Sequence, residues 1–101
     1  MELECGKITR YVLPAVRASI AEKMSMTKRY RQGEIAEKLG IVQVAVSKYL
    51  NGRYSSEVAK IKGRIERKGL ANAIVAGIEM GEPSEKIVLR IDELCNALAE
   101  S

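Results

Sequence analysis

Residues 32–50 read QGEIAEKLGIVQVAVSKYL, and this stretch decides the fold. Apolar side chains recur in it at helical spacing on both sides of Gly40. The apolar positions are Ile35, Leu39, Ile41, Val46 and Tyr49. A glycine just past the last periodic residue ends a helix, because it adopts the left-handed backbone conformation at little cost. The stretch therefore predicts two short helices, over about 32–39 and about 42–50, joined by a tight turn.

The sizes of the side chains in this stretch fit two helices that cross at a steep angle. Such a crossing leaves room only for a small residue, which suits Ala36. Val46 and the ring of Tyr49 are expected to hold the second helix against the first. That packing leaves other side chains of the second helix facing outward, namely Gln43, Val44, Ser47 and Lys48.

Outside the stretch, apolar residues keep helical spacing nearly throughout, and no segment alternates as a half-buried strand does. Further helices are predicted at about 8–24, 56–68, 70–80 and 84–98. Pro14 either opens the first of these helices in its first turn or kinks a longer helix. We therefore expect an all-α fold, a helix-turn-helix bundle of about five to six helices whose C-terminal helices serve packing and dimerisation.

The chain has 101 residues, 47% of them apolar and 30% charged, which is enough for one domain with a buried core. We expect a helix-turn-helix region over 1–54 and a C-terminal helical extension over 55–101, packed as one compact unit. The net charge of +4 is uneven, since residues 1–54 hold 10 basic and 5 acidic side chains whereas residues 55–101 hold 7 and 8. The excess of positive charge in residues 1–54 favours a surface that faces a polyanion, although an ordinary solvated surface explains this excess equally well.

The composition excludes most enzyme chemistry. The chain has no His, Phe or Trp, so it offers neither a histidine base nor a histidine metal ligand. Cys5 and Cys95 stand at opposite ends without a CxxC spacing, which indicates neither a zinc site nor a redox motif. We favour two buried free thiols, because free cysteine packs as a small apolar residue. The alternative is a disulfide, either within one chain or between two chains. We expect no catalytic residue, cofactor or metal, and the absence of a signal peptide or membrane span predicts a cytoplasmic protein.

Two runs, CGKITRYVLPAVRASIAEKM at 5–24 and EIAEKLGIVQVAVSKYLNG at 34–52, resemble a family of small archaeal predicted transcriptional regulators. The helix-turn-helix of that family is of the phage-repressor-like type and also appears fused in front of a thiamine-phosphate synthase domain. The resemblance covers residues 1–54 well and the remainder only loosely. In phage repressors, a Gln that opens the first helix of the motif hydrogen-bonds a Gln that starts the second, and Gln32 and Gln43 stand at these positions.

The stretch departs from this pattern at three positions. Arg31 and Val42 stand where Ser or Thr would cap the two helices, and Gly33 lies in the first turn of a helix. Each lost cap costs about 0.5 to 2 kcal/mol, and a glycine inside a helix costs about 1 kcal/mol. The stability of this region must therefore come from packing. Val42 also cannot donate to a phosphate as a hydroxyl would.

The resemblance implies a sequence-specific regulator of transcription that binds double-stranded DNA and places the helix at about 42–50 in the major groove. Base edges would be read by Gln43, Ser47 and Lys48, and Val44 would touch a thymine methyl. Phosphates would be held by residues before, within and after the motif: Lys28, Arg29, Arg31, Gln32, Asn51 and Arg53. The alternative is a helical protein-protein interaction module that uses the motif only as a scaffold. RNA binding is less favoured, because single-strand readers rely on exposed aromatic residues and the chain has only 4 Tyr.

A homodimer is the expected assembly, because single domains of this size seldom bury enough groove surface alone. From Glu79 onward acidic residues outnumber basic ones, so this segment should face away from DNA. The last helix carries an apolar stripe spaced as in a dimer seam, a spacing that is also typical of the inward face of a bundle helix. Its members are Ile87, Ile91, Leu94 and Leu98. The sequence identifies no small-molecule effector.

Overall fold

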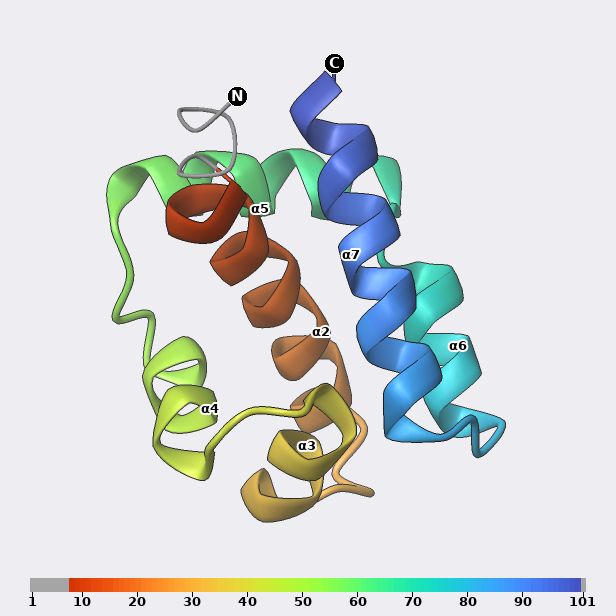
Figure 1. Ribbon diagram of the computed structural model, residues 1–101. Helices are drawn as coiled ribbons and strands as arrows, with labels where there is room; N and C mark the ends of the chain where they lie inside the picture. The colour runs from red at the N-terminus through yellow and green to blue at the C-terminus, as the bar shows by residue number, and fades with distance from the viewer. Residues whose placement is uncertain (1–7, 101) are drawn as a thin grey trace.

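The structure, a computed structural model, describes residues 8–100, where all regular elements are helical (Figure 1). A π-helical turn, η1 (Ile8–Val12), runs directly into α2 (Leu13–Met26). The remaining helices are α3 (Gln32–Leu39), α4 (Gln43–Leu50), α5 (Ser56–Lys68), α6 (Asn72–Glu79) and α7 (Ser84–Glu100). The described residues thus hold six α-helices and no strand, which confirms the expected all-α bundle. In the same part of the chain, no helix combines the length and the apolarity needed to cross a membrane.

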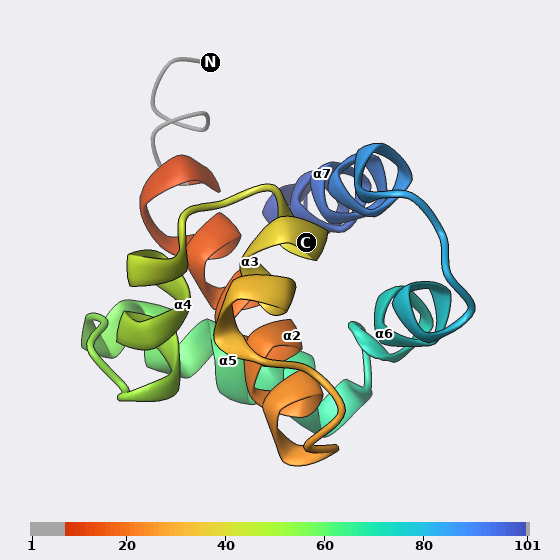
Figure 2. The same ribbon diagram turned by 90° about the horizontal axis from the view of Figure 1, so that it is seen from below.

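The helix α2 is the centre of the bundle, and every other helix contacts it. Figures 1 and 2 show it running through the middle of the molecule, with α4 to one side and α6 and α7 to the other. Its buried residues are Ala15, Val16, Ala18, Ser19, Ile20, Ala21 and Met24. Because most of these side chains are small, several helices can approach α2 closely at once.

Pro14 stands in the first turn of α2, where the π-helical turn η1 passes into α-helix. The missing amide hydrogen is harmless there, because the first N–H groups of a helix have no partner inside the helix. The residues just before it, Ile8–Val12, form a π-helical turn instead of a further stretch of α-helix.

One hydrophobic core joins the two parts of the chain. It takes Leu39 from α3 and Val46 from α4 together with Ile65 from α5 and Ile87 from α7. The Cα radius of gyration, 12.6 Å, is that expected for a compact domain of this length. The segments before and after position 54 therefore fold as one compact unit around shared side chains.

The core contradicts part of the dimer seam expected on α7. Ile87 and Ile91 are 0% and 2% exposed, and both pack inside the monomer. Leu94 and Leu98 are half-buried against the same core. The apolar stripe of α7 is therefore the inward face of a bundle helix, because its first members already have their partners within the chain.

Cys95 lies in the same stripe as a buried free thiol, as expected, whereas Cys5 lies outside the described residues. Burial, and to a lesser extent the charge of Asp92, raises the pKa of the Cys95 thiol to about 11. Since the thiolate is the reactive form, Cys95 is an unreactive packing residue at neutral pH.

The helix α7 also braces the turn between α3 and α4. The Ser84 hydroxyl lies within hydrogen-bond distance of the carbonyl oxygens of Glu37, at 3.0 Å, and Lys38, at 3.3 Å, to which it donates. A Cβ atom at Gly40 would come within 3.1 Å of Val88 Cγ2. Glycine at this position thus lets α7 pack directly against the turn that orients α4.

Candidate nucleic-acid interface

The hairpin of α3 and α4 has the form that the sequence predicts. After α3, Gly40 adopts a φ of +68°, in the left-handed region that glycine tolerates. The Ile41 N–H then donates to the Ala36 carbonyl at 3.0 Å, which satisfies one of the last carbonyl groups of α3. The second helix begins at Gln43, one residue later than predicted.

As the sequence predicts, the side chains of Arg31 and Val42 do not cap the helices that follow them. An Arg side chain carries only donors, so Arg31 cannot accept from the first turn of α3. Glu34 Oε1 instead accepts a hydrogen bond from the Arg31 N–H at 2.9 Å, which is one half of a capping box. This contact was not anticipated, although a Glu three residues after the N-cap is its usual sequence signal.

The helix α4 presents the expected edge to solvent. Val46 is 0% exposed and anchors the helix on the core, whereas Gln43, Val44 and Lys48 are exposed. Ser47 is half-buried. Residues 8–100 therefore leave this edge uncovered, which is the condition for it to contact a partner.

The hydrogen bond expected between Gln32 and Gln43 is absent among the described residues. The Gln43 amide lies over Gly33 instead, where a Cβ atom would sit 3.4 Å from Gln43 Oε1. A Cβ atom at position 33 would thus be in ordinary van der Waals contact with the amide, so this contact does not by itself require glycine there. Gln43 is exposed but rests on the neighbouring helix, so it must turn outward to read a base.

Asn51 closes α4 instead of reaching away from it. Its Nδ2 donates to the Ser47 carbonyl oxygen at 2.9 Å and lies 3.4 Å from Ser47 Oγ. Both contacts are within one helical turn, so they satisfy the C-terminal end of α4. The phosphate contact expected for Asn51 would therefore require these hydrogen bonds to break.

The expected phosphate-binding cations are all exposed on the linkers around the motif. Lys28, Arg29 and Arg31 lie between α2 and α3, and Arg53 lies between α4 and α5. Arg29 Nη1 is 3.9 Å from Glu79 Oε2, with 74% of the Arg29 side chain exposed, so this ion pair is weak and breaks readily. Within residues 8–100, the other three form no ion pair and can reorient toward an anion.

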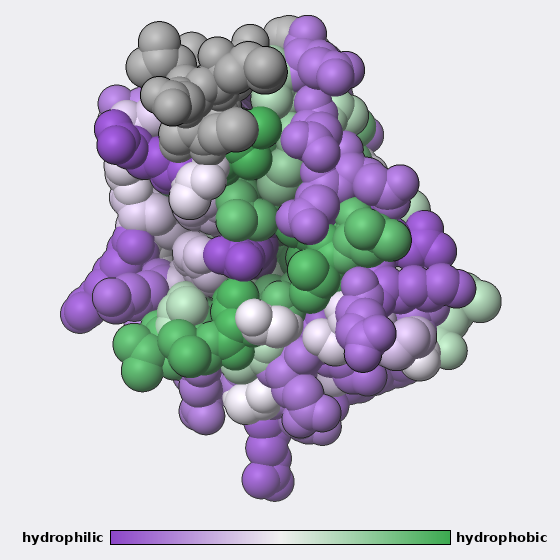
Figure 3. Space-filling view, viewed as in Figure 1, coloured by the Kyte–Doolittle hydropathy of each residue, from purple (hydrophilic) through white to green (hydrophobic). Residues whose placement is uncertain are grey.

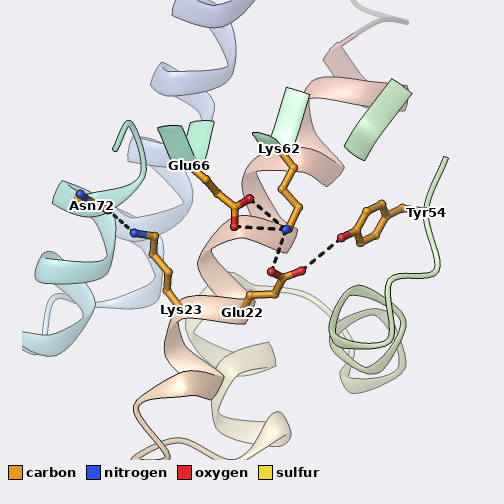
Figure 4. Close-up of polar contacts among 6 residues, drawn as sticks. All are labelled: Glu22, Lys23, Tyr54, Lys62, Glu66 and Asn72. Atoms are coloured by element: carbon orange, nitrogen blue, oxygen red, sulfur yellow. Dashed lines mark hydrogen bonds and ion pairs between the residues drawn. The ribbon is translucent and has the colours of Figure 1, made fainter. Parts of the chain in front are cut away.

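Between α2, α5 and the linker after α4, polar side chains far apart in the sequence form one cluster (Figure 4). Lys62 Nζ lies 2.8 Å from Glu22 Oε1 and 3.3 Å from Glu66 Oε2. The Tyr54 hydroxyl donates to Glu22 Oε2 at 3.3 Å. Burial disfavours the charged form of Lys62, but the carboxylates of Glu22 and Glu66 outweigh it, so the pKa of Lys62 lies above its ordinary value. The cluster ties α2 and α5 to the linker that leaves α4, a link that no local sequence signal predicts.

Two further features of the described residues bear on the choice of a site. One apolar pocket of about 340 Å³ lies between η1 and α5 and is lined by Tyr11, Val12, Glu57, Lys60 and Ile61. Among residues 8–100, no group of three or more Cys, Asp or Glu could hold a metal ion. The edge of α4 and its flanking linkers are therefore the best defined candidate site.

No protein-family model, curated protein or solved structure matches this chain. The class that the structure defines is an all-helical bundle in which a short helix-turn-helix hairpin, α3–α4, exposes one edge of its second helix. A function must therefore be argued from the chemistry of that edge and of the linkers around it.

Proposed function

We propose that this protein is a sequence-specific regulator of transcription that binds double-stranded DNA with α4 in the major groove. The observation that carries the proposal is the orientation of α4, which buries Val46 and exposes Gln43, Val44 and Lys48. An eight-residue helix is about 12 Å long, and the major groove is about 12 Å wide. The exposed edge of α4 is thus of a size that fits within the groove.

The cations around the motif support this orientation. Lys28 and Arg31 precede the hairpin and Arg53 follows it, so they flank the exposed edge of α4 along the chain. With α4 in the groove, cations on its two flanks would meet the phosphates that border the groove. Arg29, and Gln32 in the first turn of α3, would add further backbone contacts.

Base reading falls to the exposed polar side chains of α4. Lys48 can reach guanine or a phosphate, and Gln43 can contact adenine once its amide leaves Gly33. Ser47 is half-buried and already accepts from Asn51, so its contribution depends on rearrangement of that contact. Each base contact would contribute about 1 to 3 kcal/mol of discrimination against a wrong base.

The test is selection of binding sites from a random duplex library, followed by gel shifts over a range of salt concentrations. With four to six phosphates engaged per subunit, the logarithm of the affinity should fall with the logarithm of salt with a slope of about −4 to −5. Gln43→Ala and Lys48→Gln should change the preferred sequence or weaken binding. Arg64→Gln, which removes an equally exposed charge from α5, should have little effect on either measurement. Absence of an enriched sequence together with salt-insensitive binding would rule out the proposal.

A homodimer that reads two half-sites about 34 Å apart is part of the proposal. Since Ile87 and Ile91 are buried in the monomer, the half-buried Leu94 and Leu98 are the remaining members of the expected seam. A Leu94→Gln and Leu98→Gln double variant should shift the protein from dimer to monomer in light scattering. Leu89→Gln, at an exposed position on another face of α7, is the control that should stay dimeric.

The second candidate function is a protein-protein interaction module. It is favoured by the exposure of apolar side chains at the start of α4, where Val42 is 71% exposed and Val44 is 64% exposed. A module of this kind would bind DNA weakly and without the steep salt dependence described above.

A further inference from the structure

The start of α4 carries two apolar side chains that the fold does not bury. In residues 8–100, the exposed large hydrophobic side chains are Met26, Val42, Val44, Met80 and Leu89. Two of them, Val42 and Val44, stand on either side of Gln43 at the start of one helix. Figure 3 shows a hydrophobic area over α4 at the lower left of this face. Apolar surface of this kind commonly marks a contact site, so a ligand that covers it must be sought.

The position of Gln43 makes this surface more apolar than the sequence suggests. Its amide lies beside Gly33 of α3, with Oε1 3.4 Å from the position that a Cβ atom at Gly33 would take. The two valines are thus left as the leading side chains of the first turn. Val42 also makes no cap hydrogen bond, a contact that a Ser or Thr at the same position would supply.

The charges near the two valines favour DNA as the ligand over an apolar protein surface. Lys48 follows Val44 by four residues, so both lie on the same face of α4. Arg31 lies two residues before Gly33, against which the first residue of α4 rests. Exposed cations before and after the two valines along the chain suit the major groove, where apolar methyl groups lie between two rows of phosphates.

We propose that Val42 and Val44 together recognise pyrimidine 5-methyl groups, so that each half-site holds thymine at neighbouring positions facing the start of α4. Thymine is the base that presents a methyl group in the major groove of unmodified DNA. This inference rests on the proposed function and specifies the kind of base that the first turn reads. It gives Val42, which stands where a capping hydroxyl is usual, a role in specificity.

The experiment uses the full chain and a duplex that carries its selected site. Each dT is replaced in turn by dU, which removes only the 5-methyl group. Loss of one buried methyl contact should weaken binding about three- to five-fold at two or more neighbouring positions. Val42→Ala and Val44→Ala should each abolish the difference between dT and dU at one of these positions.

The control is Leu89→Ala, which trims an exposed apolar side chain on α7 and should keep the full preference for dT. Because all three variants are at exposed positions, their thermal unfolding should match that of the unchanged protein. A selected site at which dU binds as well as dT, or at which the valine variants keep the preference, would overturn this inference while the proposed function stands. Failure to select any site would instead remove the proposed function itself.

Discussion

At the scale of single residues, Lys28 stands out by a backbone conformation that favours glycine. Its φ of +59° makes it the one non-glycine residue with positive φ in residues 8–100. A side chain in this conformation costs roughly 1 to 2 kcal/mol compared with the right-handed form, a cost that glycine avoids. A lysine placed there lowers stability but keeps an exposed cation beside the hairpin.

Lys28→Gly should therefore separate stability from binding. Relief of the backbone strain should raise the free energy of unfolding by about 0.5 to 1 kcal/mol, measured by urea denaturation. Loss of the cation should weaken DNA binding and reduce the salt slope by about 0.9. Lys28→Gln keeps the strain, so it should weaken binding without the gain in stability. A Lys28→Gly protein that binds as tightly as before would exclude this lysine from the interface.

Ser19 is a residue at which the core is not optimal. Its hydroxyl oxygen is buried in α2 without a hydrogen-bond partner among the described residues. An unsatisfied buried hydroxyl costs about 1 to 3 kcal/mol, and alanine is the better helix former. Ser19→Ala should raise the free energy of unfolding by about 1 kcal/mol, measured by urea denaturation.

A matched variant at another serine should have the opposite effect. Ser55 Oγ accepts a hydrogen bond from the Val58 N–H and so caps α5. Ser55→Ala should therefore lower the free energy of unfolding by about 1 kcal/mol. If both serine variants were destabilised alike, the Ser19 hydroxyl would have a partner after all.

At the scale of the elements, the packing of α2, α5 and the linker after α4 depends on one paired charge. Lys62 lies between Glu22 and Glu66, and only 12% of its side chain is exposed. Because its pKa is raised in the folded protein, the charged form stabilises the fold below the ordinary value of 10.5. That contribution is lost as the pH rises through the folded-state pKa.

Lys62→Met should lower the free energy of unfolding by about 1 to 2 kcal/mol at neutral pH. The difference between the two proteins should stay constant up to about pH 10.5 and shrink above it, because deprotonated Lys62 no longer attracts the carboxylates. Tyr54 belongs to the same cluster, so the comparison should be repeated with Tyr54→Phe in both proteins to remove its phenol. A difference that does not change with pH would show that Lys62 acts through its alkyl chain alone.

At the scale of the whole molecule, the helix-turn-helix region depends on the C-terminal helix. Ile87, Ile91 and Cys95 of α7 belong to the shared core, and Ser84 donates to the end of α3. Removal of these side chains would expose the apolar faces of α2 and α3 to water.

A chain cut after Gly81 should therefore fail to fold cooperatively. Each fully buried side chain contributes about 1.5 to 3 kcal/mol to the free energy of unfolding. The loss of several of them therefore removes a large part of the stability of a typical domain. The far-ultraviolet circular dichroism of the truncated chain should be reduced and should melt without a sharp transition. Retention of a cooperative transition would show that residues 1–81 form an independent domain, contrary to the shared core.

The sequence by itself determined that the described residues are helical and, to within a few residues, where most of the helices lie. Helical spacing is a local property, and so is the left-handed glycine at Gly40, which lies where the pattern predicts it. It also determined which side of α4 is outward, because Val46 is the buried position of a short amphipathic helix.

Only the tertiary structure decided which distant residues meet. It turned Ile87 and Ile91 into the core, laid the Gln43 amide over Gly33 and brought Lys62 to Glu22. The physical reason is that each of these contacts joins elements that are separate along the chain. The periodicity of one helix shows that it has an apolar face, but the packing of the whole bundle determines which surface covers that face.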